Sequence, residues 1–270
     1  DALRWERIEK AAAEWDPSVM RSAANGLPAD QRALATDYAA FLQSPSERAL
    51  TWPKTERSRL MASHGLARLA KADPLAAEAQ LARYAPALGF SEADNGRVLY
   101  QAALWTVASY LPDSARLLNR VPESAYDDRL HEWRVREALS RSDWAAARAA
   151  IARMGDKQRN DSRWTWFAAR TTELGGDKVS AQALYQRAAT ASDFHRFLVA
   201  DRLNLPYQLC PLALDANAGA RNAVANDPAM LRAMALYRID RSGWATREWA
   251  EAVDRFDDTQ RRYAVEIAID

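Results

Sequence analysis

The side chains best suited to chemistry in this chain are its three histidines, and their spacing favours neither a metal site nor a catalytic site. His64, His131 and His195 lie 67 and 64 residues apart in a chain of 270 residues. None has a cysteine or a second histidine at the short spacing that zinc ligands use. The sequence also has no glycine-rich phosphate loop, nucleophile elbow or zinc-binding histidine pair. We therefore predict packing or surface roles for the histidines, and neither a metal nor a cofactor.

The ten tryptophans suggest a second chemistry, because the face of an aromatic ring can pack on a carbohydrate ring. Trp133 and Trp166 fall at the positions of an internal repeat, so we expect them in the core between helices. Four other tryptophans could serve either core packing or sugar stacking. They are Trp5, Trp15, Trp52 and Trp144.

A repeat of about 33 residues must position any site that the chain has. Tyr100, Trp133 and Trp166 are spaced 33 and 33. Three quartets with i, i+3, i+4, i+7 spacing follow the same shift, with one extra residue where the Gly175-Gly176 turn intervenes. They are Ser114, Leu117, Leu118 and Val121; Ala147, Ala150, Ile151 and Met154; and Ala181, Leu184, Tyr185 and Ala188. Each quartet lies on one helix face. The repeat predicts an all-α, right-handed superhelix (solenoid) of tetratricopeptide-like helical hairpins, which leaves one long surface for a partner.

Proline, glycine and aspartate mark the predicted ends of the helices. Asp143 and Asp177 stand four residues before their quartets, where a carboxylate caps free amides at a helix start. Pro86 is expected to separate two helices.

The alanine- and asparagine-rich stretch that contains Cys210 resembles a linker, and two amphipathic helices follow at 230–239 and 246–256. We predict a superhelical domain at 1–205, a linker at 206–228 and a partial helical linker domain at 229–270.

Charge and hydrophobicity exclude several classes of partner. The 37 basic residues nearly balance 36 acidic ones, so the chain lacks the field that attracts nucleic acid or an anionic membrane. No apolar run is long enough for a transmembrane segment. All but five of the basic residues are arginine, which reflects either genome composition or forked binding of carboxylates. Because the chain opens at Asp1 without an initiator methionine, we expect that a preceding segment was removed.

Residues from about 95 to 270 resemble the soluble lytic murein transglycosylases, in which an α-superhelical region and a linker domain precede the catalytic domain. The pattern Trp-x-x-Ala-x-Arg is followed, some twenty-five residues later, by an aromatic-rich helix ending in Ala-x-Arg-Leu. The matching segments are Asp161-Ser162-Arg163-Trp164-Thr165-Trp166, Ala168 to Arg170, Glu173 to Gly175, Ala181 to Tyr185, Phe194 to Leu203, Pro206-Tyr207, Arg247 to Ala250 and Gln260 to Ala264.

The resemblance implies a periplasmic cell-wall protein. Family members cleave the glycan strand of peptidoglycan between N-acetylmuramic acid and N-acetylglucosamine, using one glutamic acid, and leave a 1,6-anhydromuramyl end. Their catalytic domain is expected after Asp270, so this chain would be a scaffold that is inactive alone. Its implied partners are glycan strands, the missing catalytic domain of the same polypeptide and other cell-wall proteins. Arginines on the inner surface are expected to meet the carboxylates of peptide stems.

Two short matches to the family's catalytic motifs are interpreted as coincidence. Glu123-Ser124 repeats the dipeptide that carries the catalytic acid, but it lies in a turn between repeats and lacks the downstream Gly-Leu-Met-Gln segment. Asn217-Ala218-Gly219 echoes Ala-Tyr-Asn-Ala-Gly without its first two residues. We therefore name no catalytic or substrate-binding residue. The alternative function is a free-standing tetratricopeptide-like module for protein–protein interaction.

Overall fold

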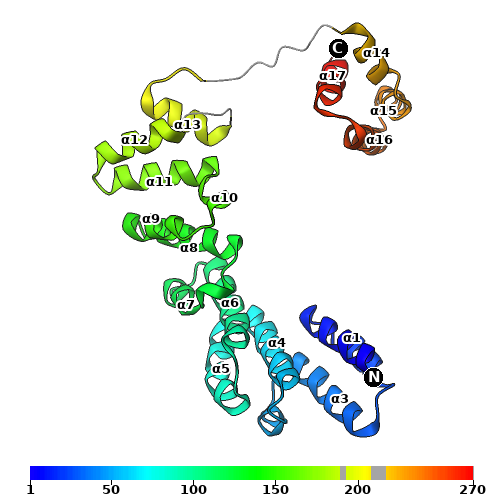
Figure 1. The fold of residues 1–270 in the computed structure, drawn as a ribbon, viewed down its shortest axis with the longest axis vertical. Helices are drawn as coiled ribbons and strands as arrows, with labels where there is room; N and C mark the ends of the chain where they lie inside the picture. Colours follow the sequence, from blue (N-terminus) through cyan, green and yellow to red (C-terminus); the bar gives the residue numbers. More distant parts are fainter. Residues whose placement is uncertain (189–192, 208–216, 270) are drawn as a thin grey trace. The chain divides into compact units, whose positions relative to one another are not determined.

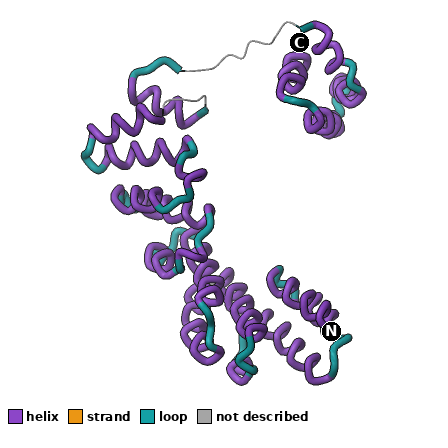
Figure 2. The backbone as a smooth tube through the Cα atoms, in the orientation of Figure 1, coloured by secondary structure: helices purple, strands orange, loops and turns teal. Residues whose placement is uncertain are grey.

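The computed structural model describes residues 1–188, 193–207 and 217–269, and within these ranges it contains helices and turns but no strand (Figures 1 and 2). The predicted all-α superhelical fold is confirmed. Two compact units form, Asp1–Gln208 and Leu209–Asp270. The predicted domain ranges 1–205, 206–228 and 229–270 stay predictions.

The first unit is a row of helical hairpins in which each hairpin packs on its neighbours. Its α-helices are α1 (Ala2–Ala13), α2 (Pro17–Ala24), α3 (Ala29–Gln43), α4 (Glu56–Ala72), α5 (Pro74–Leu88), α6 (Glu92–Ala108), α7 (Ser114–Arg120), α8 (Asp128–Ser140), α9 (Trp144–Ala152), α10 (Asp156–Arg159), α11 (Ser162–Leu174), α12 (Lys178–Ala188) and α13 (Phe194–Leu203). Two short 3₁₀ helices, η1 (Glu47–Thr51) and η2 (Glu123–Ala125), lie between them.

The repeated quartets form the seam between successive hairpins. They fall on α7, α9 and α12 and on the residue or two that follow, and all their members are buried except Leu184, which is partly buried. Many of these side chains are small, so neighbouring helices approach closely and each hairpin gains its core from the next one. Tyr100, Trp133 and Trp166 occupy the same position on α6, α8 and α11, but each is only partly buried. The expectation that Trp133 and Trp166 lie in the core is therefore only partly met.

The predicted caps are confirmed. Asp143 accepts the amide of Ala146 at 2.9 Å, and Asp177 accepts the amide of Ser180 at 3.0 Å. Each carboxylate satisfies one of the free N–H groups at a helix start, which fixes where α9 and α12 begin.

The turns of several hairpins are closed by a residue with left-handed backbone geometry. After Ser142, with φ of 57°, the amide of Asp143 donates to the carbonyl of Ala138 at 2.9 Å. The equivalent bond follows Gly176, at 3.2 Å. This six-to-one bond ends a helix and reverses the chain at once. The same positive φ recurs in other hairpin turns, at Trp15, Tyr110 and Asp240.

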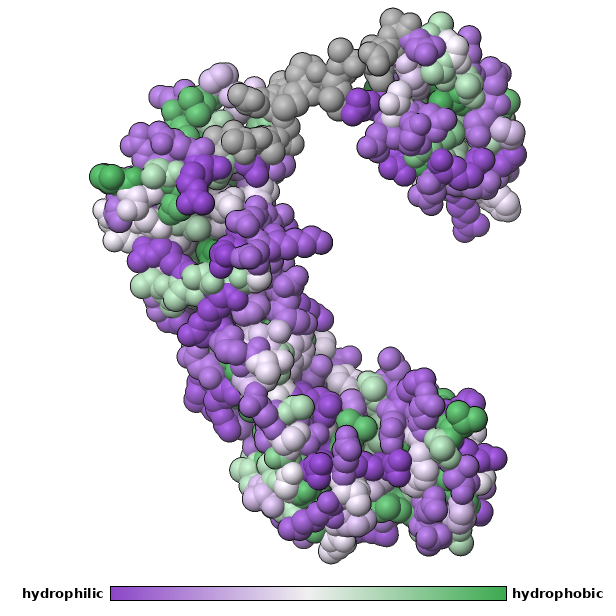
Figure 3. Space-filling view, in the orientation of Figure 1, coloured by the Kyte–Doolittle hydropathy of each residue, from purple (hydrophilic) through white to green (hydrophobic). Residues whose placement is uncertain are grey.

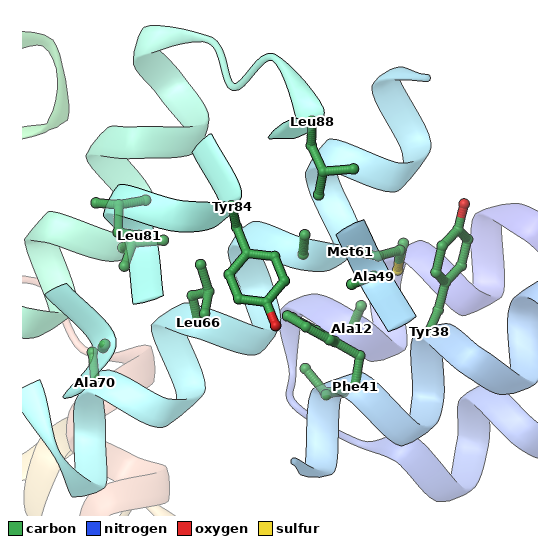
Figure 4. Packing of buried hydrophobic residues seen from close by; sticks show 14 of the residues in the cluster. Ala12, Tyr38, Phe41, Ala49, Met61, Leu66, Ala70, Leu81, Tyr84 and Leu88 are labelled. Atoms are coloured by element: carbon green, nitrogen blue, oxygen red, sulfur yellow. The ribbon is translucent and has the colours of Figure 1, made fainter. Parts of the chain in front are cut away.

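Aromatic rings build the core of the first half of this unit, where the 33-residue identity is absent. The ring of Phe41 lies edge-on to Trp52 at 5.2 Å and to Tyr84 at 5.3 Å. Figure 4 shows Phe41, Tyr84 and Leu66 pointing toward one another. A Cβ atom at Gly65 would lie 2.5 Å from the Phe41 ring, so α4 can approach α3 only because glycine stands there. The N-terminal hairpins therefore stack as the later ones do, with larger side chains in the seam.

Pro86 does not separate two helices, contrary to our prediction. It lies inside α5, which continues to Leu88 and ends at Gly89 with φ of 71°. Proline lacks the amide hydrogen that would continue the helical hydrogen bonds. One turn from the C-terminus this costs a single bond, and the chain reverses at the glycine instead.

The described part of the second unit, residues 217–269, contains four helices, α14 (Ala218–Ala225), α15 (Pro228–Arg238), α16 (Ser242–Arg255) and α17 (Asp258–Ile269). They enclose a separate core that includes Val224, Met230 and Phe256. The stretch predicted as linker thus contains a helix, because Asn217 caps α14 through the amide of Ala220 and Val224 is buried in the new core. Cys210 and the residues around it lie outside the described part of the chain.

Two substitutions in equivalent turns test the left-handed geometry. A Cβ atom at Gly176 would meet nothing within 4 Å, so Gly176→Ala changes only the backbone preference. We expect it to lower the free energy of unfolding by about 1 kcal/mol, because left-handed geometry strains any residue with a Cβ atom. Ser142→Gly relieves the same strain and should raise the free energy by roughly 0.5 kcal/mol. Urea unfolding followed by circular dichroism measures both, and shifts of the same sign would contradict the assignment.

Candidate functional site

Glu123, which matches the family's catalytic dipeptide, is held in an ion-pair network at the start of η2. Its carboxylate accepts from Arg134 at 3.1 Å and from Arg153 at 2.8 Å. The hydroxyl of Ser124 donates to Glu92 at the start of α6. A carboxyl group that serves as a proton donor needs a neutral, desolvated surrounding. Glu123 instead lies beside two positively charged guanidinium groups. The geometry therefore gives it a structural role, in which it joins η2 to α8 and α9.

The neighbouring histidine belongs to the same packing arrangement. The guanidinium of Arg134 lies 3.7 Å from the centroid of the Tyr126 ring, and the ring centroids of Tyr126 and His131 lie 4.8 Å apart. Burial raises the pKa of Tyr126 to about 12 and lowers the pKa of His131. The tilted ring pair and the buried cation hold the loop before α8, as expected of a histidine in a packing role.

His64 lies on α4, facing a buried polar cluster that joins α4 to α6. Arg97 donates to Ser63 at 2.5 Å and to Asp94 at 3.2 Å, and Asp94 is only 7% exposed. Burial lowers the pKa of His64 to about 4, and the charge of Arg97 acts in the same direction. The histidine is therefore neutral at pH 7 and acts as a packing residue.

The tryptophans left open by the sequence divide into two groups. Trp5 and Trp52 are each only 7% exposed, so both belong to the core. Trp15 and Trp144 are partly buried. The ammonium of Lys71 lies over Trp15 at 5.9 Å. This ring face therefore already has a cation beside it, and the contacts favour packing over sugar stacking.

Arginines gather in an open groove at the C-terminal end of the first unit. The groove has a volume of about 470 Å³ and is formed by residues of α9, α10, α11, α12 and α13 with the turn after α10. Its lining combines four arginines with small aliphatic and polar side chains: Arg148, Arg159, Arg187, Arg196, Ile151, Ala152, Ala168, Leu184, Ala188, Asn160, Thr165 and Thr172. We call it the arginine groove. Among the described residues, no acidic side chain lines it.

Main-chain carbonyls near helix ends hold three of these guanidinium groups in place. Arg148 donates to Thr171 at 3.1 Å, near the end of α11. Arg159 donates to the carbonyl of Ala152, which ends α9, and Arg196 to that of Ala188, which ends α12. Helix C-termini carry unpaired carbonyls and partial negative charge, which attract cations. Arg159 also pairs with Asp156 and Arg196 with Asp193, whereas no carboxylate of the described residues lies within ion-pair distance of Arg148.

The expectation that arginines line an inner surface stays a prediction, and the sequence alone did not identify the arginines of the groove. The arginine groove assembles residues from five helices, and the carbonyl that anchors Arg148 is 23 residues away in the chain. One signal was available, since Arg120, Arg153 and Arg187 follow the same 33- and 34-residue shifts as the quartets. The catalytic-motif fragments do not meet the groove: neither Glu123 nor Asn217 lines it.

No other chemical cluster stands out in the ranges that the structure describes. They contain no group of three histidine, cysteine, aspartate or glutamate side chains that could hold a metal ion. None of the helices there is long and apolar enough to cross a membrane. Figure 3 shows hydrophilic side chains over much of the visible face of the first unit between α6 and α11. Stacked helical hairpins define the class of the first unit as an α-helical superhelix.

Solved structures identify the superhelix more closely. An inactive variant of the lytic transglycosylase Slt from Pseudomonas aeruginosa matches 97% of this chain with a TM-score of 0.77 and 28% sequence identity. The 70 kDa soluble lytic transglycosylase from Escherichia coli matches 98% with the same TM-score and 21% identity. The chain spans 43% of the length of either protein. No family model matches the sequence, and no curated protein matches it. The chain has the α-superhelical fold of the soluble lytic transglycosylases, and its resemblance to that family is confirmed.

The pH dependence of stability should report the partly buried environment of His64. Its folded pKa of about 4 lies below the unfolded value of about 6.5, so the folded chain binds fewer protons between these values. Stability is therefore lost as the pH falls from 6.5 through 4, by roughly 2–3 kcal/mol from this group. Urea unfolding between pH 7.5 and 4.5 measures the loss. His64→Gln should flatten this part of the profile, and an unchanged profile would contradict the assignment.

The ion pairs of Glu123 predict a stability effect. Glu123→Gln removes the anion from Arg134, whose side chain is only 11% exposed. We expect the free energy of unfolding to fall by about 1–2 kcal/mol, because a mostly buried guanidinium loses its partner. Arg153→Gln is the matched control: its side chain is 56% exposed, and it should cost less than roughly 0.5 kcal/mol. If Glu123→Gln is as stable as the unmodified chain, the structural role of Glu123 is contradicted.

Proposed function

We propose that this chain is the non-catalytic superhelical scaffold region of a periplasmic peptidoglycan lytic transglycosylase. The parent enzyme would cleave the bond between N-acetylmuramic acid and N-acetylglucosamine and form 1,6-anhydromuramyl ends. The observation that carries this proposal is the match to the Pseudomonas aeruginosa enzyme over 97% of the chain, at a TM-score of 0.77 and 28% identity.

The arrangement of side chains is consistent with a scaffold. The one glutamate with a motif match, Glu123, is paired with two arginines. Cleavage without water needs a single carboxyl group that gives and then takes a proton beside the scissile bond. Among the described residues, the groove with the most distinctive chemistry presents cations instead of such an acid. The superhelix would therefore hold and orient peptidoglycan, while a catalytic domain of the same polypeptide would act on the glycan strand.

Incubation with purified sacculi tests the scaffold function. The purified chain should sediment with intact sacculi and release no anhydromuropeptides, as measured by mass spectrometry of the supernatant. A full-length soluble lytic transglycosylase serves as the positive control for release, and a heat-unfolded sample of the chain as the control for nonspecific sedimentation.

Each contrary result points to a different function. Release of anhydromuropeptides by the chain alone would show that it contains an active site, and Glu123→Gln would then be the first variant to assay. Failure to sediment with sacculi would contradict the cell-wall role. Such a chain would be better described as a free-standing helical-hairpin module that binds another protein.

A further inference from the structure

An arginine recurs at the same place in three successive repeats. Arg120, Arg153 and Arg187 each stand one residue before the last member of their quartet. The side chains of Arg120 and Arg153 are about half exposed, and Arg187 is exposed. Stacking of the hairpins thus places a guanidinium group at the end of each second helix, at the same side of the seam.

The first two of these arginines have a glutamate partner. Arg120 forms an ion pair with Glu78 on α5, where hydrogen bonds from Arg116 lower the pKa of the glutamate. Arg153 pairs with Glu123 at 2.8 Å. In both cases the carboxylate comes from an earlier element of the stack, so the guanidinium charge is neutralised within the protein.

The third arginine has no such partner. Within the described part of the chain, Arg187 makes no ion pair and no hydrogen bond from its side chain. The residue 33 positions after Glu123 is Asp156, whose carboxylate pairs with Arg159 in the same short helix. Aspartate is one methylene shorter than glutamate, and the next residue, Lys157, adds a further positive charge. Among the described residues, the third repeat keeps the guanidinium group but has no carboxylate paired with it, unlike the other two.

The surroundings of Arg187 have the composition of a site for a carboxylate. It lines the arginine groove together with Arg148, for which no carboxylate lies within ion-pair distance among the described residues. Guanidinium groups bind carboxylates through two parallel hydrogen bonds. The remainder of the lining is short and largely aliphatic, as at Ala152, Ala168 and Ala188. These surfaces match methyl-sized side chains, and the volume of about 470 Å³ suits a small ligand.

We propose that the arginine groove binds a short peptide that carries several carboxylates on small aliphatic residues, with Arg187 and Arg148 as its carboxylate-binding residues. The identification of that peptide as the stem peptide of peptidoglycan rests on the proposed function. The ligand supplies to Arg187 the anion that Glu78 supplies to Arg120 and that Glu123 supplies to Arg153.

Calorimetric titration with a synthetic stem peptide tests this site. The probe is L-alanyl-γ-D-glutamyl-meso-diaminopimelic acid with free carboxylates, compared with the same peptide amidated at every carboxyl group. We expect the amidated peptide to bind at least tenfold more weakly, because a neutral amide has neither the negative charge nor the second acceptor oxygen that a carboxylate offers to a guanidinium. Arg187→Gln should weaken binding of the free peptide roughly tenfold. Arg153→Gln, the same change at the equivalent but paired position, should leave the affinity within twofold.

The outcomes separate this site from the scaffold function. Equal affinity for free and amidated peptides, or equal weakening by Arg187→Gln and Arg153→Gln, overturns the groove as a carboxylate site. Circular dichroism melts of each variant show whether it remains folded, and Arg148→Gln provides a second variant inside the groove.

If the chain sediments with sacculi but binds no peptide, the scaffold function holds and the groove assignment fails. If the chain binds the peptide through Arg187 but does not sediment with sacculi, the carboxylate site is supported and the cell-wall function is contradicted.

Discussion

A helical hairpin can bury its apolar stripe only against the next hairpin, and this constraint determines the rest of the first unit. The quartets on α7, α9 and α12 are the contact surfaces, and their small residues bring neighbouring helices close together. Close approach demands tight turns, which explains the repeated left-handed residue at Tyr110, Ser142 and Gly176. It also demands fixed helix starts, which Asp143 and Asp177 supply. The tight turns, the helix caps and the apolar stripes all follow from the need of each hairpin to pack on the next one.

The same requirement accounts for much of the arginine content. Where apolar seams are narrow, neighbouring hairpins are also joined at their edges by long side chains. Arg57 of α4 reaches Glu9 of α1 at 2.8 Å, and Arg68 of α4 reaches the carbonyl of Leu42 on α3 at 2.7 Å. A guanidinium suits this task better than an ammonium, because its several fixed donors can bind a carbonyl or a carboxylate on another element. Neither genome composition nor ligand binding is needed to explain most of these arginines, so those that lack an anion are the informative ones.

Features that repeat along the chain could be predicted from the sequence, and features set by one particular neighbour could not. The quartets, caps and hairpin turns follow a fixed period, so all of them were predictable as far as α12. Pro86 was misjudged because its effect depends on its distance from Gly89 at the helix end. The helix α14 was missed because Val224 finds a core only when the second unit assembles. The arginine groove is of the same kind: its residues meet only after five helices have packed, although the recurrence of Arg120, Arg153 and Arg187 was visible.

A repeat protein gains a specific site where one copy of the repeat departs from the others. The seam residues of the third hairpin are equivalent to those before it, so its packing needs no other explanation. Its difference lies at the edge, where Asp156 pairs within α10 instead of reaching across to Arg187. The insertion at Gly175-Gly176 lengthens the same hairpin by one residue. The third repeat therefore has Asp156 paired within its own helix, while Arg187 lines the arginine groove. Because each hairpin contacts only its neighbours, such a change can arise at one repeat without disturbing the stack.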